Sequence, residues 1–207
     1  MPAKKTQASA SGVPKNWPPL LPYLRSPCYS KTLTAQVQGT LHLTKLDVPS
    51  EEQIRTVVAP YSNVRITPIS IASHPANGQY GLFAAQNITP GAFILSYLGY
   101  VHDSTEMDES SDYDLSLDRE LGIGVDASKM GNEARFINDY RGVSSGPNAE
   151  FRDAYVDLGK GKVERRVGVF ALRAGKSGKH SKGITKGQEI LVSYGKGFWS
   201  ERASTYE

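Results

Sequence analysis

Gly131-Asn132-Glu133-Ala134-Arg135-Phe136-Ile137-Asn138-Asp139-Tyr140 is the most informative run of this chain. It mixes large apolar side chains with charged and amide side chains and follows neither a helical nor a strand period. Polar groups set among buried apolar ones need hydrogen-bond partners, so a run of this kind favours a functional site. The alternative is a short buried turn in which the Asn side chains satisfy loose backbone groups. The surrounding segments decide between the two.

Length and composition indicate one globular domain with tails. The chain has 207 residues, of which 39% are hydrophobic and 22% are charged, as is ordinary for a globular protein able to bury a core. No apolar run approaches the roughly 20 residues that cross a bilayer, and no apolar segment follows the basic N-terminus, so we expect no membrane span and no secretory signal.

The metal-binding and disulfide-forming residues are few. Cys28 is the single cysteine, which excludes an internal disulfide and a Cys-rich zinc cluster. His42, His74, His102 and His180 lie far apart and show no ligand spacing. We therefore expect no metal site and a reducing compartment, the cytoplasm or the nucleus.

Charge is distributed unevenly along the chain. The net charge is only +3, but Lys and Arg gather at the N-terminus and in 160–186, whereas 103–120 carries eight acidic residues and one arginine. Such segregation favours a charged partner, with a solvated acidic loop as the alternative.

The N-terminal third predicts a tail followed by a flanking segment. Residues 1–16 have almost nothing to bury and predict a disordered basic tail. Residues 17–73 are expected to pack on the body, beginning with a proline-broken strap over 17–24. Within them, 32–45 predicts a strand or hairpin arm, and the Ser50-Glu51-Glu52-Gln53 capping pattern predicts a short helix that ends before Pro60.

The remainder reads as short strands separated by Gly and Pro. Strands are predicted over 64–73, 92–101, 121–126, 163–172 and 188–194, with an acidic loop over 103–120 and a basic loop over 174–183. No long amphipathic helical pattern is present. The fold class is therefore mostly β.

Four motifs in order resemble the SET-domain protein-lysine methyltransferases, in particular fungal- or plant-like members that lack the Cys-rich zinc segments. They are Gly78-Gln79-Tyr80-Gly81 with Tyr97-Leu98-Gly99, then Gly131-Asn132 with Ala134-Arg135-Phe136-Ile137-Asn138, then Pro147-Asn148-Ala149, and lastly the run from Lys186 to Tyr194. The second is the most specific. The resemblance covers about 77–199 and places a SET domain at 74–199, with a C-terminal tail at 200–207.

The resemblance implies a β-clip fold of short sheets with a knot-like C-terminal crossing, S-adenosyl-L-methionine as cofactor, and a protein lysine as methyl acceptor. It implies catalytic roles for Tyr194 and Tyr97 and no metal. The cofactor-binding residues that it implies are Gln79, Tyr80, Gly81, Tyr113, Phe136, Asn138, Asp139, Tyr194 and Trp199. The implied substrate is a basic protein or peptide such as a histone tail, which favours the nucleus; no nucleic-acid site and no membrane contact are evident.

The chemistry of these residue types suits methyl transfer. A free lysine has a pKa of about 10.4, and an apolar channel lowers it by disfavouring the ammonium. A tyrosine hydroxyl can orient the neutral amine without adding a full charge. The position two residues before the catalytic tyrosine controls the number of methyl groups in the family; here it is Val192, small enough to leave room for more than one.

Several positions depart from the family pattern. Gln79 stands where the first Gly of Gly-x-Gly is usual, Tyr100 where a Glu often follows Tyr-x-Gly, and Asp139 where a His follows the Asn. These departures keep open a second hypothesis, a catalytically inactive SET-like module that binds a chromatin partner. A third hypothesis is a nucleic-acid-associated protein that uses its basic tail and loop, with binding that falls steeply with salt.

Overall fold

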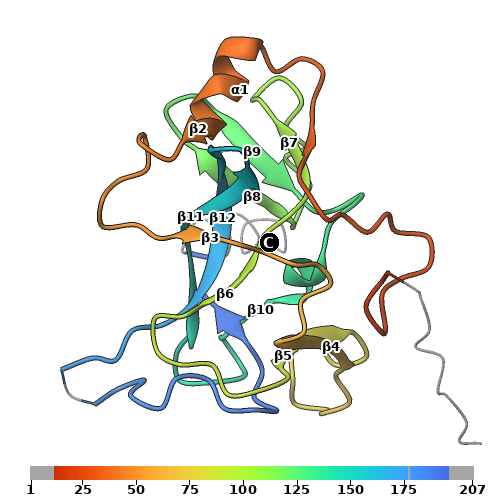
Figure 1. The fold of residues 1–207 in the computed structure, drawn as a ribbon. Coiled ribbons are helices and arrows are strands. Elements are labelled where there is room, and N and C mark those ends of the chain that lie inside the picture. Colours follow the sequence, from red (N-terminus) through yellow and green to blue (C-terminus); the bar gives the residue numbers. More distant parts are fainter. Residues whose placement is uncertain (1–11, 177, 196–207) are drawn as a thin grey trace, which may run out of the picture.

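The computed structural model describes residues 12–176 and 178–195. Thirteen strands, most of them short, and two short helical segments make up the regular structure of these residues (Figure 1). The strands are β1 (Cys28–Tyr29), β2 (His42–Thr44), β3 (Ile54–Arg55), β4 (Val64–Pro68), β5 (Tyr80–Ala84), β6 (Phe93–Ser96), β7 (Tyr100–His102), β8 (Asp114–Asp118), β9 (Ile123–Asp126), β10 (Asn138–Asp139), β11 (Ala149–Gly159), β12 (Lys162–Ala171) and β13 (Leu191–Val192). The helices are α1 (Ala35–Leu41) and the 3-10 helix η1 (Glu133–Phe136).

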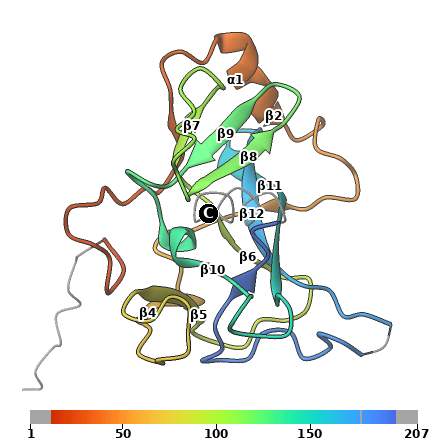
Figure 2. The same cartoon turned by 180° about the vertical axis from the view of Figure 1, so that it is seen from behind.

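A long hairpin of β11 and β12 runs through the middle of the molecule, and smaller sheets lie above and below it (Figures 1 and 2). Its sheet has the order β2-β12-β11-β3, with β6 also paired to β12. One smaller sheet has the order β1-β7-β9-β8, and two further pairs are β4-β5 and β10-β13. The prediction of a mostly β fold built from short sheets is confirmed.

The β11–β12 hairpin has a tight turn. Gly159 pairs with Lys162, and the two turn residues, Lys160 and Gly161, both have positive φ. That backbone conformation matches the twist of the flanking strands. The sequence analysis predicted β12 but not β11, whose charged residues at 150, 152 and 153 mask its strand pattern.

The predicted strand over 32–45 is wrong in its first part, because residues 35–41 form α1. Thr34 accepts a hydrogen bond from the Val37 backbone N–H and caps the helix. Leu33 and Leu41 are buried, and Val37 packs against the core between them. Burial at a spacing of four residues outweighs the β-branched composition.

The helix predicted from Ser50 is also wrong. Ser50 donates to the neighbouring Glu51 side chain, and Ile54 and Arg55 form β3 instead. They pair in parallel with Tyr155 and Val156 of β11. A strand partner distant in sequence thus overrides a local capping signal.

Three other segments differ from the prediction. The strand predicted over 92–101 divides into β6 and β7, because Gly99 packs so closely on the next strand that a Cβ there would lie 2.3 Å from the Asp126 carbonyl oxygen. The predicted acidic loop contains β8, which pairs with β9. The last strand is shorter than predicted and comprises only β13.

One core joins the N-terminal strap to the sheets. The Trp17 ring is buried and lies edge-on to Tyr23 and Phe136, with centroid distances of 5.1 and 5.7 Å. Tyr23 forms a β-bridge to Gly131. The strap predicted over 17–24 therefore packs directly on the 131–140 segment. No helix within the described ranges has the length and apolar character needed to span a bilayer.

Candidate active site

The 131–140 segment combines structural polar groups with site residues. Asn132 is fully buried; its amide oxygen accepts from the Leu98 backbone N–H at 3.1 Å, and its Nδ2 donates to the Ser96 carbonyl at 2.8 Å. Asn132 thus satisfies the backbone where β6 gives way to β7. At this residue the alternative interpretation, an Asn that satisfies loose backbone groups, is correct.

Glu133 connects the 131–140 segment to the N-terminal part of the chain through hydrogen bonds. Its carboxylate accepts from the Tyr23 hydroxyl at 3.0 Å and from the Tyr61 backbone N–H at 2.9 Å, and its side chain is buried. Burial raises the pKa of Glu133 above its ordinary value, while these hydrogen bonds act in the opposite direction.

Strands β10 and β13 bring the two most specific motifs together. Asn138 pairs with Leu191, and Asp139 pairs with Val192, in parallel. Asn148 clamps β13 from its other side: its amide oxygen accepts from the Leu191 N–H, and its Nδ2 donates to the Glu189 carbonyl. The Asn138 segment and the last strand, which the resemblance implies cross in a knot-like arrangement, thus lie side by side.

A buried polar chain supports Asn138. Its Nδ2 donates to Glu189 Oε1 at 2.8 Å and approaches the Tyr80 carbonyl at 3.4 Å. Glu189 Oε2 lies 3.0 Å from His74 Nε2. Because His74 Nδ1 accepts from the Ala76 N–H, its proton sits on Nε2 and is donated to Glu189. The amide of Asn138 is therefore held in one orientation.

Gly81 is required by this arrangement. A Cβ at Gly81 would lie 2.5 Å from Glu189 Oε1, so any side chain would displace the carboxylate that holds Asn138. Beside it, Tyr80 is more than one-third exposed and lies edge-on to Phe136 at 6.0 Å. The structure thus brings Tyr80, Gly81, Phe136 and Asn138 together. Gln79 immediately precedes them and is engaged through its backbone, with its carbonyl accepting from the Ile69 N–H.

A narrow pocket lies on the other side of the 136–139 segment. It has a volume of about 70 Å³ and brings together the rings of Tyr97, Tyr113, Phe151 and Tyr194 with Ile137 and Leu115. The Tyr194 hydroxyl donates to the Ile137 carbonyl at 2.6 Å, and the Tyr97 hydroxyl donates to the Tyr113 carbonyl at 2.7 Å. Two tyrosine hydroxyls are thus fixed by backbone carbonyls at one small aromatic pocket.

Both hydroxyls stay protonated well above neutral pH. Burial raises the pKa of Tyr97, and Tyr194 adds to the effect. Burial likewise raises the pKa of Tyr194, with a further contribution from Asp139. Each tyrosine is therefore a neutral hydrogen-bonding group.

The pocket also holds charged groups. The Arg135 guanidinium lies over the Tyr113 ring at 4.4 Å, and its Nε donates to the Ala127 carbonyl. Asp112 and Asp114 line the same pocket. Burial raises the pKa of Asp114, while His102 opposes the shift. The acidic segment thus reaches the pocket through residues on and beside β8.

Asp139 has a structural use that the sequence did not reveal. Its Oδ2 accepts from the Tyr194 backbone N–H at 2.7 Å and from Arg141 Nη1 at 2.9 Å, and its Oδ1 accepts from the Arg141 N–H. The carboxylate therefore holds the backbone that carries Tyr194. A departure from the family pattern here supports the candidate catalytic tyrosine.

The sequence analysis missed three residues at the site: His74, Glu189 and Phe151. Glu189 lies in the motif that runs from Lys186 to Tyr194, but the sequence did not indicate that it is buried next to Asn138. Tyr113 and Tyr194, both predicted to contact the cofactor, line the aromatic pocket, and their contact with the cofactor stays a prediction. Trp199 lies outside the described residues. Within those residues, no group of three or more His, Cys, Asp or Glu could hold a metal ion.

The fold and these motifs define the class of protein. Residues 79–195 match the SET domain family, and the chain belongs to it. It is 31% identical over 110 residues to the histone-lysine N-methyltransferase ASHH3 of Arabidopsis thaliana, covering 48% of this chain and 27% of that protein. It is 28% identical over 131 residues to the human histone-lysine N-methyltransferase EHMT1, covering 61% of this chain and 9% of that protein. The chain thus spans less than a third of these curated relatives.

Similar solved structures include two of one polycomb complex. One is the Chaetomium thermophilum polycomb repressive complex 2, at 26% identity and a TM-score of 0.47, covering 66% of this chain and 16% of that chain. The other is the same complex in an autoinhibited conformation bound to S-adenosylmethionine, at 25% identity and a TM-score of 0.48, covering 70% of this chain and 17% of that chain.

Proposed function

We propose that this protein transfers a methyl group from S-adenosyl-L-methionine to the side-chain amine of a protein lysine. Membership of the SET domain family and relatives named as histone-lysine N-methyltransferases support the reaction class. The observation that carries the proposal is the narrow pocket at which Tyr97 and Tyr194 present fixed neutral hydroxyls, with Asn138 on the segment that forms its wall.

The residues around Asn138 suit the cofactor. The Asn138 amide oxygen can accept from an ammonium group, since the hydrogen bonds that this side chain makes to other described residues use Nδ2. Tyr80 and Phe136 offer aromatic edges and faces for a purine. S-adenosyl-L-methionine, when bound, supplies an electrophilic methyl group. We assign Gln79, Tyr80, Gly81, Phe136, Asn138 and Asp139 to this face.

The tyrosine pocket would prepare the lysine. Its aromatic and aliphatic walls exclude water and disfavour an ammonium, and the Arg135 guanidinium disfavours it further, while Asp112 and Asp114 in the same lining act in the opposite direction. The two tyrosine oxygens direct the amine lone pair without adding charge. Placement and desolvation of a neutral amine would therefore supply most of the catalysis.

The substrate we propose is a basic protein segment such as a histone tail. Asp112 and Asp114 at the pocket, together with the acidic segment 103–120, would attract Lys and Arg residues that flank the target lysine. Such a substrate would place the protein in the nucleus.

Calorimetric titration of S-adenosyl-L-methionine into the purified protein tests the proposal, with Asn138→Ala and Tyr194→Phe alongside. We expect binding that Asn138→Ala abolishes and Tyr194→Phe retains, followed by methylation of histone peptides detected by mass spectrometry. Absence of cofactor binding by the folded protein would contradict the enzyme and leave the second hypothesis, a SET-like module that binds a chromatin partner.

A further inference from the structure

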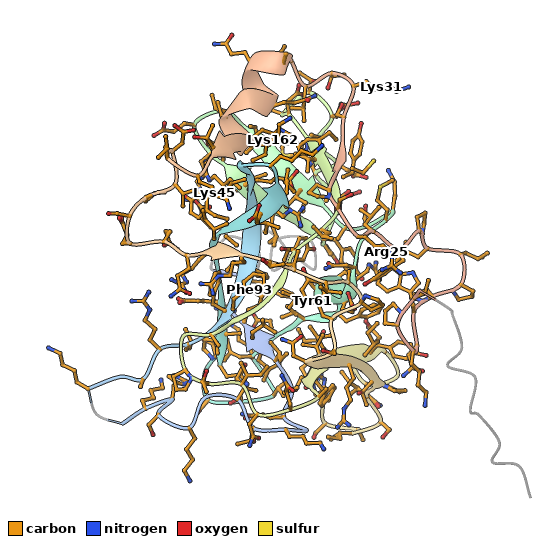
Figure 3. All side chains as sticks on the ribbon, in the orientation of Figure 1. Arg25, Lys31, Lys45, Tyr61, Phe93 and Lys162 are labelled. Carbon is orange, nitrogen blue, oxygen red and sulfur yellow. The ribbon has the colours of Figure 1, made fainter. Side chains whose placement is uncertain are left out.

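An open groove of about 640 Å³ lies on the far face of β11 from the tyrosine pocket. It is formed where β3 and β11 meet the turn that leads into β6. Phe93, at the start of β6, lies beside the segment that carries β3 (Figure 3). The groove is lined by Glu52, Arg55, Gly91, Phe93, Arg152 and Arg173, among others.

Two of its arginines are fixed by aromatic rings. The Arg152 guanidinium lies 3.9 Å from the centroid of Phe170, and the Arg55 guanidinium lies 5.3 Å from the same centroid and 5.4 Å from that of Phe93. Stacking on a ring occupies the flat face of a guanidinium and leaves its N–H edge for a ligand. The pair is thus positioned before any ligand arrives.

The hydrogen-bonding capacity of these arginines is not used up by the protein. The Nε atoms of Arg55 and Arg152 are buried and have no hydrogen-bond partner in the described part of the chain, although Arg152 Nε lies 3.3 Å from a Glu150 carboxylate oxygen. Buried donors are normally satisfied. Burial lowers the pKa of Arg55, and the neighbouring Arg152 lowers it further, while Glu52 opposes the shift. An anion bound beside the two guanidinium groups would offset the desolvation of Arg55 and its repulsion by Arg152.

The charge pattern limits the size of that anion. Three arginines line the groove together with Glu51 and Glu52. Carboxylates at this position repel an extended polyanion such as a nucleic-acid backbone, whereas a compact anion can sit among the guanidinium groups. Paired guanidinium edges match the oxygens of a phosphate group.

We propose that this groove binds a phosphate monoester, either free or carried on a phosphorylated side chain of a partner protein. Phe151 and Arg152 are adjacent on β11 and point to opposite faces of the strand, so the phosphate site backs onto the tyrosine pocket without sharing residues with it. The proposal does not depend on the proposed methyl transfer.

Titrations followed by NMR test the proposal with three probes: inorganic phosphate, a phosphoserine peptide and the same peptide with serine. We expect phosphate-dependent shifts of the groove resonances, and a loss of affinity of at least about tenfold in Arg173→Ala and Arg152→Lys, because each removes charge-assisted hydrogen bonds. Arg173 is exposed, so its replacement leaves the fold intact. Lys162→Ala, which removes a charge outside the groove, is the matched control and should bind as the wild type does.

The probes also separate the sources of the phosphate. A phosphopeptide that binds at least about tenfold more tightly than inorganic phosphate identifies a phosphorylated partner, and equal affinities identify a free phosphate compound. The proposal is overturned if no probe binds at millimolar concentration, if the serine peptide or a DNA duplex binds equally well, or if the arginine variants bind as tightly as Lys162→Ala.

Discussion

Phe151 and Arg152 are neighbours on β11, yet they line two hollows of opposite character. On the Phe151 side, four aromatic rings narrow a pocket to about 70 Å³. On the Arg152 side, three arginines line an open groove of about 640 Å³. One side is suited to holding a neutral group away from water, and the other is suited to attracting a charged group from water.

The difference teaches how one strand can serve two kinds of chemistry. Alternate residues of a strand point to opposite faces, so a single backbone layer separates a pocket walled mainly by aromatic rings from a groove lined by three arginines. The two sides should therefore respond independently to mutation, since sites with no shared partners are usually additive.

Of the substitutions considered, Tyr194→Phe should lower methyl transfer the most. It removes the hydroxyl that donates to the Ile137 carbonyl and that would orient the amine, so we expect kcat to fall about 100-fold or more. Cofactor affinity and phosphate binding should remain within about twofold of wild type. Single-turnover methylation and calorimetry measure these effects. A variant with full activity would remove Tyr194 from the catalytic machinery.

Adjacent substitutions on β11 test the separation of the two sides directly. Phe151→Ala opens the tyrosine pocket to water and should lower kcat/KM about tenfold, with phosphate binding retained. Arg152→Lys should show the reverse pattern, with methylation of an unphosphorylated peptide unchanged. Equal losses of both functions in both variants would show that the faces are coupled.

Asp139 offers a smaller and graded test. Asp139→Ala leaves the Tyr194 N–H without its acceptor, so we expect kcat to fall about fivefold to tenfold and stability to fall by about 2 kcal/mol. Asp139→Asn keeps an oxygen that can accept from Tyr194 and should lose less on both measures. Chemical denaturation and steady-state kinetics give the two values. An Asn variant worse than the Ala variant would contradict a positioning role.

Glu133 should give the smallest effect and one that depends on pH. Its folded pKa is raised above an unfolded value of about 4.3. The stability that it contributes is therefore fully present below the unfolded pKa and is lost as pH rises through the folded one. Glu133→Gln should thus gain stability relative to wild type as pH rises, by about 1 kcal/mol, with the amide oxygen accepting from the Tyr61 N–H and the amide NH2 donating to the Tyr23 hydroxyl, which reverses that bond. Urea denaturation at acidic and neutral pH checks this, and a difference independent of pH would contradict it.

Sequence reasoning gave the fold class and the position of the main motifs, because those depend on short, local patterns. The pairing of β10 with β13 brings together the two motifs that the resemblance implied would cross. The roles of the individual site residues remain predictions until the variants are made.

Tertiary contacts account for what the sequence did not reveal. Ile54 forms a strand because it pairs with β11. The helix that Thr34 caps is stabilised because Leu41 is buried in the core. Similarly, the sequence shows Glu189 only as a polar residue in a strand motif. Its role becomes visible in the structure, where it lies against Gly81 and accepts a hydrogen bond from Asn138. Pairings between distant segments carry no local signal.

The short β10–β13 pair has a consequence for the order of folding. Asn138 and Leu191 are separated by more than fifty residues, so the contact closes a long loop and gains only two residue pairs. Contacts of this kind form slowly. Because Tyr194 follows β13, the tyrosine pocket is completed only when this late contact forms. During synthesis, activity would therefore appear after most of the sheet has formed, which makes catalysis itself a reporter of complete folding.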